Sequence, residues 1–419
     1  MPKKNTSRSA QGSGTIRKKT VTRKGQEYTY WEARLTVGRD PGTGKQIQKS
    51  FTGKTQKEVR EKLQAAAVAV NDGDYLEPTA LTLGTWLDTW LAEYCGDKKY
   101  LTLKKYERDC RVHIKPALGA VKLSKLTAPI IQKFYNELGR TGKAIQSKDS
   151  KGNIVTRHEP LSPQSIRGIH GVLTKALNVA QRQGMIKHNP TVLCTVPKLE
   201  KKEVAPLTEE QLKAFLALCD TEAYGDIYKV IVFTGLREGE ALGLTWDCVD
   251  FAKGELKINK QLQRRGKGAE LVPTKNSKPR YLTAPPLVMQ ILRQQQTRQL
   301  EERFKAGEMW QGFQNAEQRK TALVFTKADG TFIAANSLYV RYKRLAQKIG
   351  APNSKVHDLR HTFAVLSLQN GDHVKTVQEN LGHATAAFTL DVYGHVSERM
   401  KQDSADRMQQ YINSISGAV

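Results

Sequence analysis

The sequence has 419 residues, of which 39% are hydrophobic and 26% charged, and its 67 Lys and Arg outnumber its 41 Asp and Glu. This length exceeds one ordinary hydrophobic core and predicts several domains, and the composition excludes a chain that is disordered throughout. The net charge of +26 favours a polyanion as partner, nucleic acid first, with a solvated basic surface as the alternative.

The distribution of residue types disfavours two further classes. No run of about 18 apolar residues is present, so no membrane span is expected, and the basic N-terminus lacks the apolar segment of a secretory signal. The cysteines are scattered, odd in number and without paired metal-ligand spacing. We therefore expect buried free thiols in a reducing cytoplasm. The five cysteines are Cys95, Cys110, Cys194, Cys219 and Cys248.

The N-terminal region is expected to form a small sheet backed by one helix. Residues 1–14 are polar and small, and predict a disordered basic tail. Tyr28–Val37 alternates β-branched and aromatic residues with polar ones, and Gln46–Phe51 follows a Pro-Gly turn as another strand. A helical pattern comes next. Residues 15–72 are therefore predicted to be a domain of three strands and one helix.

The predicted sheet is basic. Two or three strands can enter the DNA major groove and contact base edges there, so the interleaved Arg17, Arg34 and Arg39 are candidate DNA contacts. The alternative is an ordinary solvated face of a small domain.

Residues 80–196 are expected to form a helical domain. Four stretches place apolar residues at helical spacing, namely Leu83–Tyr94, Leu103–Ile114, Ala128–Leu138 and Ser165–Gln183. Between the third and fourth, residues 147–157 are rich in turn formers and predict a hairpin or a flexible excursion. Lys104, Lys105 and Arg108 lie on exposed faces, where basic residues can contact the DNA backbone without reading sequence.

Residues 197–206 are charged and bounded by prolines, and predict a linker between domains. Thr208 and Gln211 then form a capping-box pattern that restarts structure. Residues 207–419 are expected to be mostly helical, with a small antiparallel sheet between about Glu255 and Thr283 and a strand at Leu323–Phe325. The fold class is therefore multidomain α+β. The C-terminal tail is expected to pack either on its own chain or on a neighbouring subunit.

A phosphate site is predicted near the end of the chain. His357 and Arg360 are three residues apart, so on a helix they project from one face. If Ser354 caps that helix, both lie in its first turn, where the helix dipole disfavours a guanidinium unless an anion offsets it.

Arg237 repeats this pattern, because it follows a Thr-Gly pair at the expected start of a helix. Arg237 and Arg360 could hold one phosphodiester with planar, charge-assisted donors. The alternative is a structural arginine paired with Glu240, one turn further on.

Other residues would complete the chemistry. Lys275 and Lys278 lie on a loop between two strands, from which an ammonium can donate a proton to a substrate oxygen. Carboxylate clusters of metal-ligand type and a Gly-rich phosphate loop are absent from the sequence, which disfavours two-metal hydrolysis and ATP use. The protein would then supply the attacking group, and Tyr393 is the candidate nucleophile. Taken alone, Tyr393 would be a core or rim tyrosine and His383 a helix-capping histidine.

The order of these residues resembles the tyrosine recombinase family, and within it the integrases of phages and conjugative transposons. The motifs are Thr234-Gly235-Leu236-Arg237 with Glu240, Lys275 in a strand turn, His357 with Arg360, Leu381-Gly382-His383, and Val392-Tyr393-Gly394-His395. The resemblance covers nearly the whole chain. The helical middle resembles the family's core-binding domain, and the N-terminal sheet and helix resemble its arm-binding domain. Residues 147–157 and Glu301–Arg319 are less typical of the family.

The resemblance implies a site-specific recombinase that integrates and excises a mobile element. Tyr393 would attack the scissile phosphate and form a 3′-phosphotyrosyl bond. Arg237 and Arg360 would bind the non-bridging oxygens, His357 and His383 would assist them, and Lys275 would protonate the leaving 5′-oxygen.

The resemblance also implies the partners. The substrate would be double-stranded DNA at core and arm attachment sites, with a homotetramer exchanging strands through a Holliday junction. An excisionase or a DNA-bending host protein would assist. No cofactor, metal, ATP or membrane is expected. Two other functions remain open, a type IB topoisomerase-like DNA relaxing enzyme and a catalytically idle DNA-binding regulator.

Overall fold

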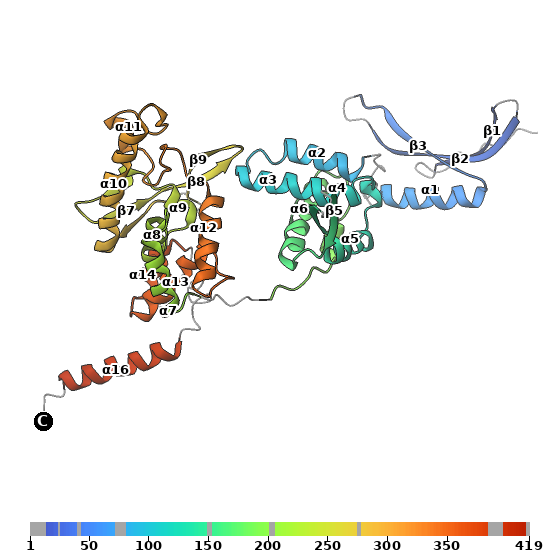
Figure 1. The fold of residues 1–419 in the computed structure, drawn as a ribbon. Coiled ribbons are helices and arrows are strands. Elements are labelled where there is room, and N and C mark those ends of the chain that lie inside the picture. Colours follow the sequence, from blue (N-terminus) through green and yellow to red (C-terminus); the bar gives the residue numbers. More distant parts are fainter. Residues whose placement is uncertain are drawn as a thin grey trace, which may run out of the picture. The chain divides into compact units, whose positions relative to one another are not determined.

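The computed structural model describes residues 14–23, 26–39, 43–71, 81–148, 153–200, 206–274, 278–383 and 397–415. Contacts divide the chain into two compact units, Met1–Glu200 and Lys201–Val419. The first contains a sheet with a helix and a helical bundle, and the second is mostly helical with small sheets (Figure 1). The predicted multidomain α+β fold is confirmed. The predicted disordered tail lies, apart from Gly14, outside the described residues.

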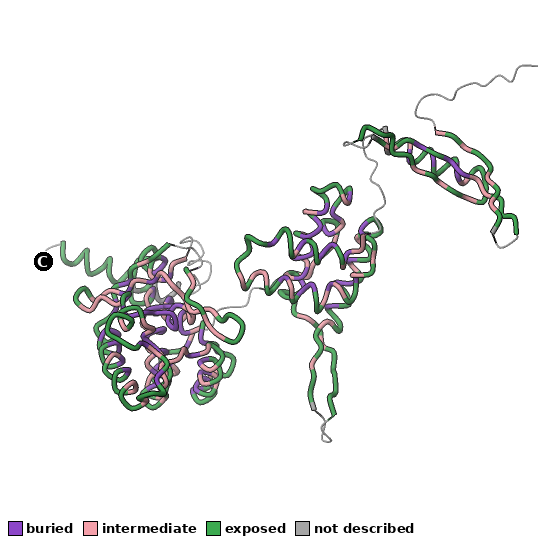
Figure 2. Tube along the Cα trace, turned by 90° about the horizontal axis from the view of Figure 1, so that it is seen from above, coloured by how far each residue is buried: buried purple, intermediate pink, exposed green. Residues whose placement is uncertain are grey.

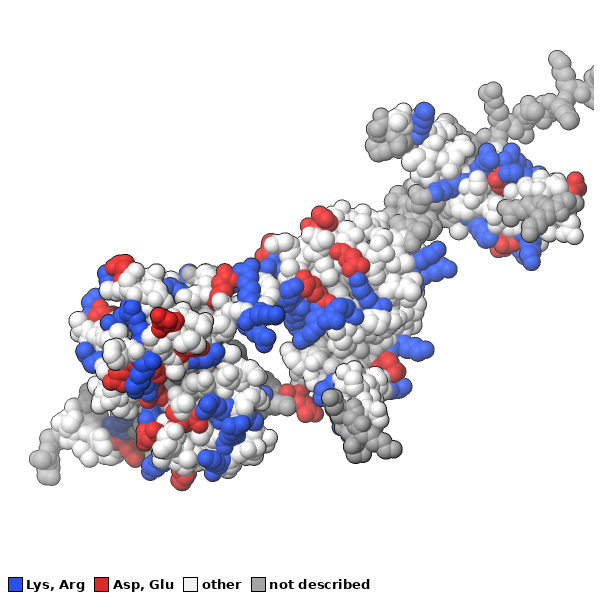
Figure 3. Space-filling model, turned by 45° about the horizontal axis from the view of Figure 1, so that its top comes forward, with Lys and Arg blue, Asp and Glu red and all other residues white. Residues whose placement is uncertain are grey.

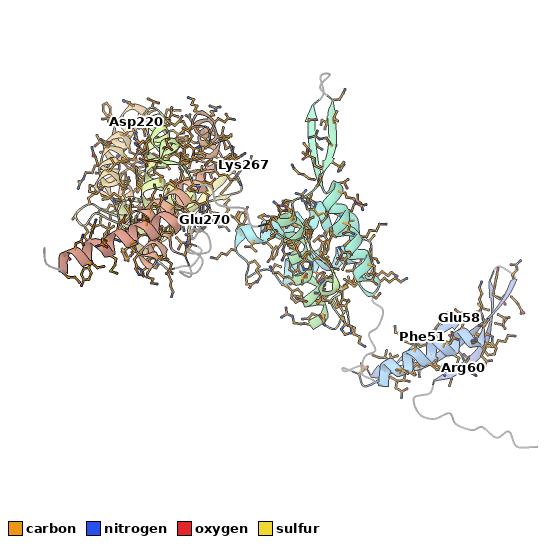
Figure 4. All side chains as sticks on the ribbon, turned by 90° about the horizontal axis from the view of Figure 1, so that it is seen from below. Phe51, Glu58, Arg60, Asp220, Lys267 and Glu270 are labelled. Atoms are coloured by element: carbon orange, nitrogen blue, oxygen red, sulfur yellow. The ribbon has the colours of Figure 1, made fainter. Side chains whose placement is uncertain are left out.

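The N-terminal part is an antiparallel sheet in the order β1-β2-β3 with one helix on it. The elements are β1 (Thr15–Arg23), β2 (Gln26–Arg39), β3 (Gln46–Gly53) and α1 (Gln56–Asn71). Alternation along β2 turns Ala33 and Leu35 to the helix, where they pack with Val59 and Leu63, which lie one turn apart. Figure 4 shows the side chains of this part, including Phe51, which packs against the same cluster.

The helical bundle has one hydrophobic core, to which α2, α5 and α6 contribute. Its helices are α2 (Leu83–Glu93), α3 (Tyr100–Asp109), α4 (Lys115–Leu118), α5 (Ala128–Thr141) and α6 (Pro163–Arg182), with a π-helical turn at Cys110–Ile114 and 3-10 turns at Leu123–Lys125 and Pro190–Leu193. Trp86 is buried and its indole N–H donates to the carbonyl of Ala176 at 3.0 Å. The four predicted helices are confirmed, although the second ends in the π-helical turn.

The predicted insertion is a hairpin of two antiparallel strands, β4 (Lys143–Lys148) and β5 (Ile154–Glu159). It is exposed along most of its length (Figure 2). Residues 149–152 at its centre lie outside the described residues.

The second unit is built around one large core. Its helices are α7 (Glu209–Cys219), α8 (Gly225–Thr234), α9 (Glu238–Leu242), α10 (Pro286–Ala306), α11 (Ala316–Lys320), α12 (Ala335–Lys348), α13 (Val356–Gln369) and α14 (Val374–Leu381), with 3-10 turns at Trp246–Cys248 and Gly307–Met309. The predicted capping box is confirmed, because Thr208 Oγ1 accepts from the Gln211 N–H and Gln211 Oε1 accepts from the Thr208 N–H. Further along the chain is α16 (Ser397–Ile415).

Two small sheets complete this unit. One has the order β10-β7-β6 and the other pairs β8 with β9. The strands are β6 (Val249–Asp250), β7 (Glu255–Ile258), β8 (Lys260–Arg265), β9 (Gly268–Pro273) and β10 (Arg280–Thr283). Figure 4 labels Lys267 and Glu270 on the β8–β9 hairpin. The strand predicted at Leu323–Phe325 is wrong. Only Leu323 forms a bridge, with Thr245, and the apolar run exists because Val324 and Phe325 fill the core.

Within the described parts of the chain, no helix is long and apolar enough to cross a membrane. All five cysteines belong to those parts, and all are free thiols.

Candidate active site

Arg237 lies at a tight junction between α8 and α9. Gly235 caps α8 in the left-handed conformation with φ +67°, and a Cβ there would lie 2.5 Å from Phe363. Arg237 is the N-cap of α9 and does not lie in the helix's first turn as predicted, because the chain is still extended at that residue. Its backbone N–H and its Nη1 donate to the Glu240 carboxylate at 3.0 and 2.7 Å.

Glu240 is the buried counter-ion of this junction, with 1% of its surface exposed. Besides Arg237, it accepts two hydrogen bonds from Arg280, from Nη2 at 2.6 Å and from Nη1 at 3.1 Å. Burial by itself would raise the pKa of Glu240, but the hydrogen bond and charge of Arg280, together with Arg237, lower it to about 2. Glu240 is therefore ionised at neutral pH and holds both guanidiniums.

Arg360 is buried in α13, and its guanidinium joins two helix ends. Nη1 donates to the carbonyl of Gly235 and Nη2 to that of Leu381, both at 2.6 Å. Carbonyls at helix C-termini carry partial negative charge, which a guanidinium offsets. The conditional prediction that Ser354 caps this helix is wrong. Lys355 is the N-cap, and the buried Ser354 hydroxyl instead hydrogen bonds Tyr342 at 2.6 Å.

His383 directly follows the end of α14. Gly382 adopts the left-handed conformation with φ +62° and turns the chain out of the helix. Gln378 holds the residue after this turn, because its carbonyl accepts from the His383 N–H at 3.1 Å and its Nε2 donates to the His383 carbonyl at 3.0 Å. Burial, and then the charges of Arg360 and Arg237, lower the pKa of His383 to about 3.

His357 and His361 lie one turn apart on α13, with their ring centres 4.8 Å apart and edge to face. His357 keeps an exposed surface, so only partial desolvation lowers its pKa, and the charges of Arg360 and Arg237 lower it further. Burial, followed by the effect of His357, lowers the pKa of His361 to about 4. The three imidazoles of the site are therefore neutral at pH 7, so each keeps one N–H donor and one acceptor nitrogen.

The structure brings together four of the six predicted catalytic residues. Arg237 Nη2 lies 3.4 Å from the carbonyl of Gly382, next to His383, and both arginines act electrostatically on His357 and His383. Lys275 and Tyr393 lie outside the described residues. Among the described groups, three guanidiniums and three neutral imidazoles lie close to two carboxylates, Glu240 and Asp358. This positive excess suits an anion with several oxygens, such as a phosphodiester.

Sequence reasoning missed two residues of this cluster, Arg280 and His361. Arg280 begins β10 and faces the buried Ile258 across the strand pair, and a charged residue opposite a buried one signals a buried partner. His361 follows His357 by four residues, so the helical period places both on one face.

Two of the predicted DNA contacts of the N-terminal sheet, Arg17 and Arg34, lie on the face opposite α1. Arg17 is the direct cross-strand partner of the buried Glu32 and donates to it at 2.6 and 2.9 Å. Arg34 and Lys19 approach the same carboxylate at 3.6 and 3.7 Å. Arg39 is the last residue of β2, and nothing further is described of its side chain. One carboxylate thus lies close to three cations on this face. Figure 3 shows Lys and Arg side chains over the N-terminal part of the chain.

The predicted contacts of the helical bundle are organised similarly. Lys105 and Arg108 donate to the buried Asp109 at 2.6 and 2.8 Å, while Lys104 pairs with the exposed Glu107. The cationic ends of Lys105 and Arg108 remain about half exposed, so the structure is compatible with a phosphate contact at these side chains.

Comparison with known proteins gives two family matches. Residues 205–400 match the phage integrase family, and residues 82–139 match the phage integrase N-terminal SAM-like domain. The chain is also similar to a protein described as "Tyrosine recombinase XerC-like" from Caldanaerobacter subterraneus subsp. tengcongensis. The two are 29% identical over 413 residues, which cover 94% of this chain and 98% of the relative.

Two solved proteins share the fold. The Tn1549 transposon integrase in complex with a circular intermediate DNA superposes with a TM-score of 0.62 at 21% identity, over 78% of this chain and 100% of the other. A lambda integrase dimer bound to a COC′ core site has a TM-score of 0.51 at 18% identity, over 89% and 94%. A lambda integrase tetramer bound to a Holliday junction has a TM-score of 0.50 at 18% identity, over 86% and 92%. The two family matches, the similar recombinase and the arginine-histidine cluster agree, and the chain belongs to the phage integrase family as a tyrosine-type site-specific DNA recombinase.

Proposed function

We propose that this recombinase integrates and excises a mobile element, breaking and rejoining DNA through a covalent bond between Tyr393 and a 3′-phosphate. The observation that carries the proposal is the cluster of Arg237, Arg360, His357 and His383 around one point. Such a set of fixed donors matches the charge that develops on the phosphate oxygens when a nucleophile attacks.

The two arginines would bind the non-bridging oxygens. Arg360 is held in one plane by two backbone carbonyls and Arg237 by Glu240, so little reorganisation is needed when the phosphate enters. His357 and His383 are neutral at pH 7, and each would donate a hydrogen bond to the phosphate or accept the Tyr393 proton.

The 5′-oxygen leaves as an alcohol and needs a proton. Lys275 would supply it, as the family resemblance implies, and Lys278 is the neighbouring alternative. The phosphotyrosyl bond then retains the energy of the phosphodiester, so a 5′-hydroxyl of another strand can attack it and release Tyr393 without an external energy source.

We propose the same division of labour along the chain as the sequence suggests. Residues 15–72 would bind arm-type sites through the basic face of the sheet, residues 80–196 would bind the core site, and residues 207–419 would carry the chemistry. One lambda integrase structure is a tetramer bound to a Holliday junction. We infer a homotetramer on DNA for this chain too, with the tail that contains α16 packing in cis or on a neighbouring subunit.

The reaction is proposed to take place in the cytoplasm, where the five free thiols would stay reduced. A DNA-bending host protein and an excisionase would assist, because separated arm and core sites must be brought together by a sharp bend.

The test is a nicked suicide substrate that carries the recombination core site. The wild-type chain should form a covalent protein–DNA complex that resists denaturation, while Tyr393→Phe should bind the same DNA and form none. A covalent complex formed by Tyr393→Phe would remove Tyr393 from its role. With two marked duplexes, exchanged products indicate recombination, whereas relaxed supercoils without exchange indicate the topoisomerase-like alternative. If the wild-type chain binds the DNA without cleaving it, the result indicates the catalytically idle DNA-binding regulator.

A further inference from the structure

Arg280 touches the site from the sheet side, although the proposed mechanism gives it no role. It is the first residue of β10, and only 14% of its side chain is exposed. Its guanidinium donates to both oxygens of Glu240, at 2.6 and 3.1 Å, and its Nε donates to the carbonyl of Asn380 at 2.9 Å. One side chain thus joins α9, which carries Glu240, to the end of α14.

The contact at the end of α14 is close. A Cβ added to Gly382 would lie 3.1 Å from Nη1 of Arg280, so the guanidinium lies against the glycine whose left-handed conformation leads to His383. Arg280 therefore contacts Asn380 and Gly382, two of the three residues that directly precede His383. A smaller side chain at position 280 would leave this turn without that support.

The contact with Glu240 has an electrostatic consequence for Arg237. Glu240 is almost fully buried, and its carboxylate is shared between two guanidiniums. If Arg280 were absent, the whole negative charge would act on Arg237. A guanidinium that is fully neutralised by a buried carboxylate attracts a phosphate less strongly.

We propose that Arg280 is a positioning residue for strand cleavage, which shares the charge of Glu240 so that Arg237 stays available to the phosphate, and which supports the turn that presents His383. This inference rests on the proposed roles of Arg237 and His383. Arg280 itself does not touch the DNA.

The experiment measures the rate of covalent complex formation on the nicked suicide substrate, together with DNA affinity and melting temperature, in the full-length chain. Arg280→Met should slow cleavage about tenfold or more, which corresponds to about 1.4 kcal/mol in the barrier, while DNA affinity changes less than about twofold. Arg280→Lys should slow cleavage only about threefold, because an ammonium still pairs with Glu240 but loses the other contacts of the guanidinium. The matched control is Arg341→Met, which removes the Arg341–Glu222 ion pair of the same unit and should leave the rate unchanged.

A second change separates charge sharing from mere structural support. Glu240→Gln combined with Arg280→Met removes the unshared negative charge, so the double variant should cleave faster than Arg280→Met alone. If Glu240 and Arg280 only brace the fold, the double variant cleaves no faster than Arg280→Met, and that result overturns the charge-sharing role. A rate for Arg280→Met within twofold of wild type overturns the whole inference.

Failure of the proposed function gives a different pattern, because the wild-type chain would then form no complex or Tyr393→Phe would form one. If Arg280→Met does not fold, Arg280→Lys decides. It should cleave about threefold more slowly, because an ammonium cannot contact both Glu240 oxygens and the Asn380 carbonyl together, and a wild-type rate would contradict the proposal.

Discussion

Replacing Arg360 by Lys tests whether the carbonyls at the ends of α8 and α14 fix the orientation of the Arg360 guanidinium. Arg360 is 1% exposed and donates to the carbonyls of Gly235 and Leu381 at 2.6 Å each. A lysine ammonium keeps the charge but cannot span both carbonyls, so at least one charge-assisted hydrogen bond is lost, at a cost of about 1.5–3 kcal/mol. For a unit of roughly 200 residues, each kcal/mol lowers the melting temperature by about 2–4 °C, which predicts a fall of about 3–12 °C.

The assay is differential scanning calorimetry of the full-length chain, with the suicide-substrate cleavage rate as second readout. Arg341→Lys is the control, because Arg341 pairs with Glu222 at a half-exposed position and such pairs contribute about 0–1 kcal/mol. Its melting temperature should fall by no more than about 4 °C. Arg360→Lys should also cleave at least about a hundredfold more slowly. A melting temperature within 1 °C of wild type for Arg360→Lys would refute the reasoning that the two carbonyls fix the guanidinium.

Three further predictions concern other parts of the chain. Removing residues 1–70 should weaken binding to arm-site DNA but spare cleavage of core sites in a gel assay, and equal arm affinity would contradict the arm-binding assignment. Lys275→Ala should slow cleavage, and a substrate with a 5′-sulfur leaving group, which needs no proton, should restore the rate. If this substrate restores the rate of Lys278→Ala but not that of Lys275→Ala, Lys278 is the general acid. His361 and His383, whose pKa values are lowered to about 4 and about 3, stay neutral in the folded chain while unfolded histidines protonate below about pH 6.5, so stability should fall from pH 6.5 toward pH 5 by up to about 1.4 kcal/mol per pH unit for each of the two. A urea midpoint that does not change between pH 7 and pH 5 would exclude this burial.

The helices and the N-terminal sheet could be predicted from the sequence because their signals are local. The apolar stripes of α2, α5 and α6 repeat with the helical period, and alternation in β2 identifies the face that packs on α1. The strand predicted at Leu323–Phe325 failed for a reason that periodicity cannot resolve. A short apolar run that fills a core looks like a buried strand whether or not it pairs.

Part of the candidate active site could also be predicted from the sequence. His357 and Arg360 share a face by helical spacing, and the glycine of Leu381-Gly382-His383 marks a left-handed helix end, so each motif determines its own local geometry. The cap of α13 was wrong because a serine before a helix can also bond elsewhere, and here Ser354 bonds the buried Tyr342.

What only the tertiary structure decided is how these local pieces meet. Arg280 is 40 residues from Glu240 and 100 from Asn380 in sequence, yet its guanidinium contacts both. Arg360 joins carbonyls that lie 125 and 21 residues away. The sequence by itself determined the local geometry of each motif, because spacing within a helix or turn is set by the backbone, and together with the family resemblance it predicts which residues carry the phosphate chemistry. Which carboxylate and carbonyls orient those residues depends on strand pairing and helix packing between distant segments, which no local pattern encodes.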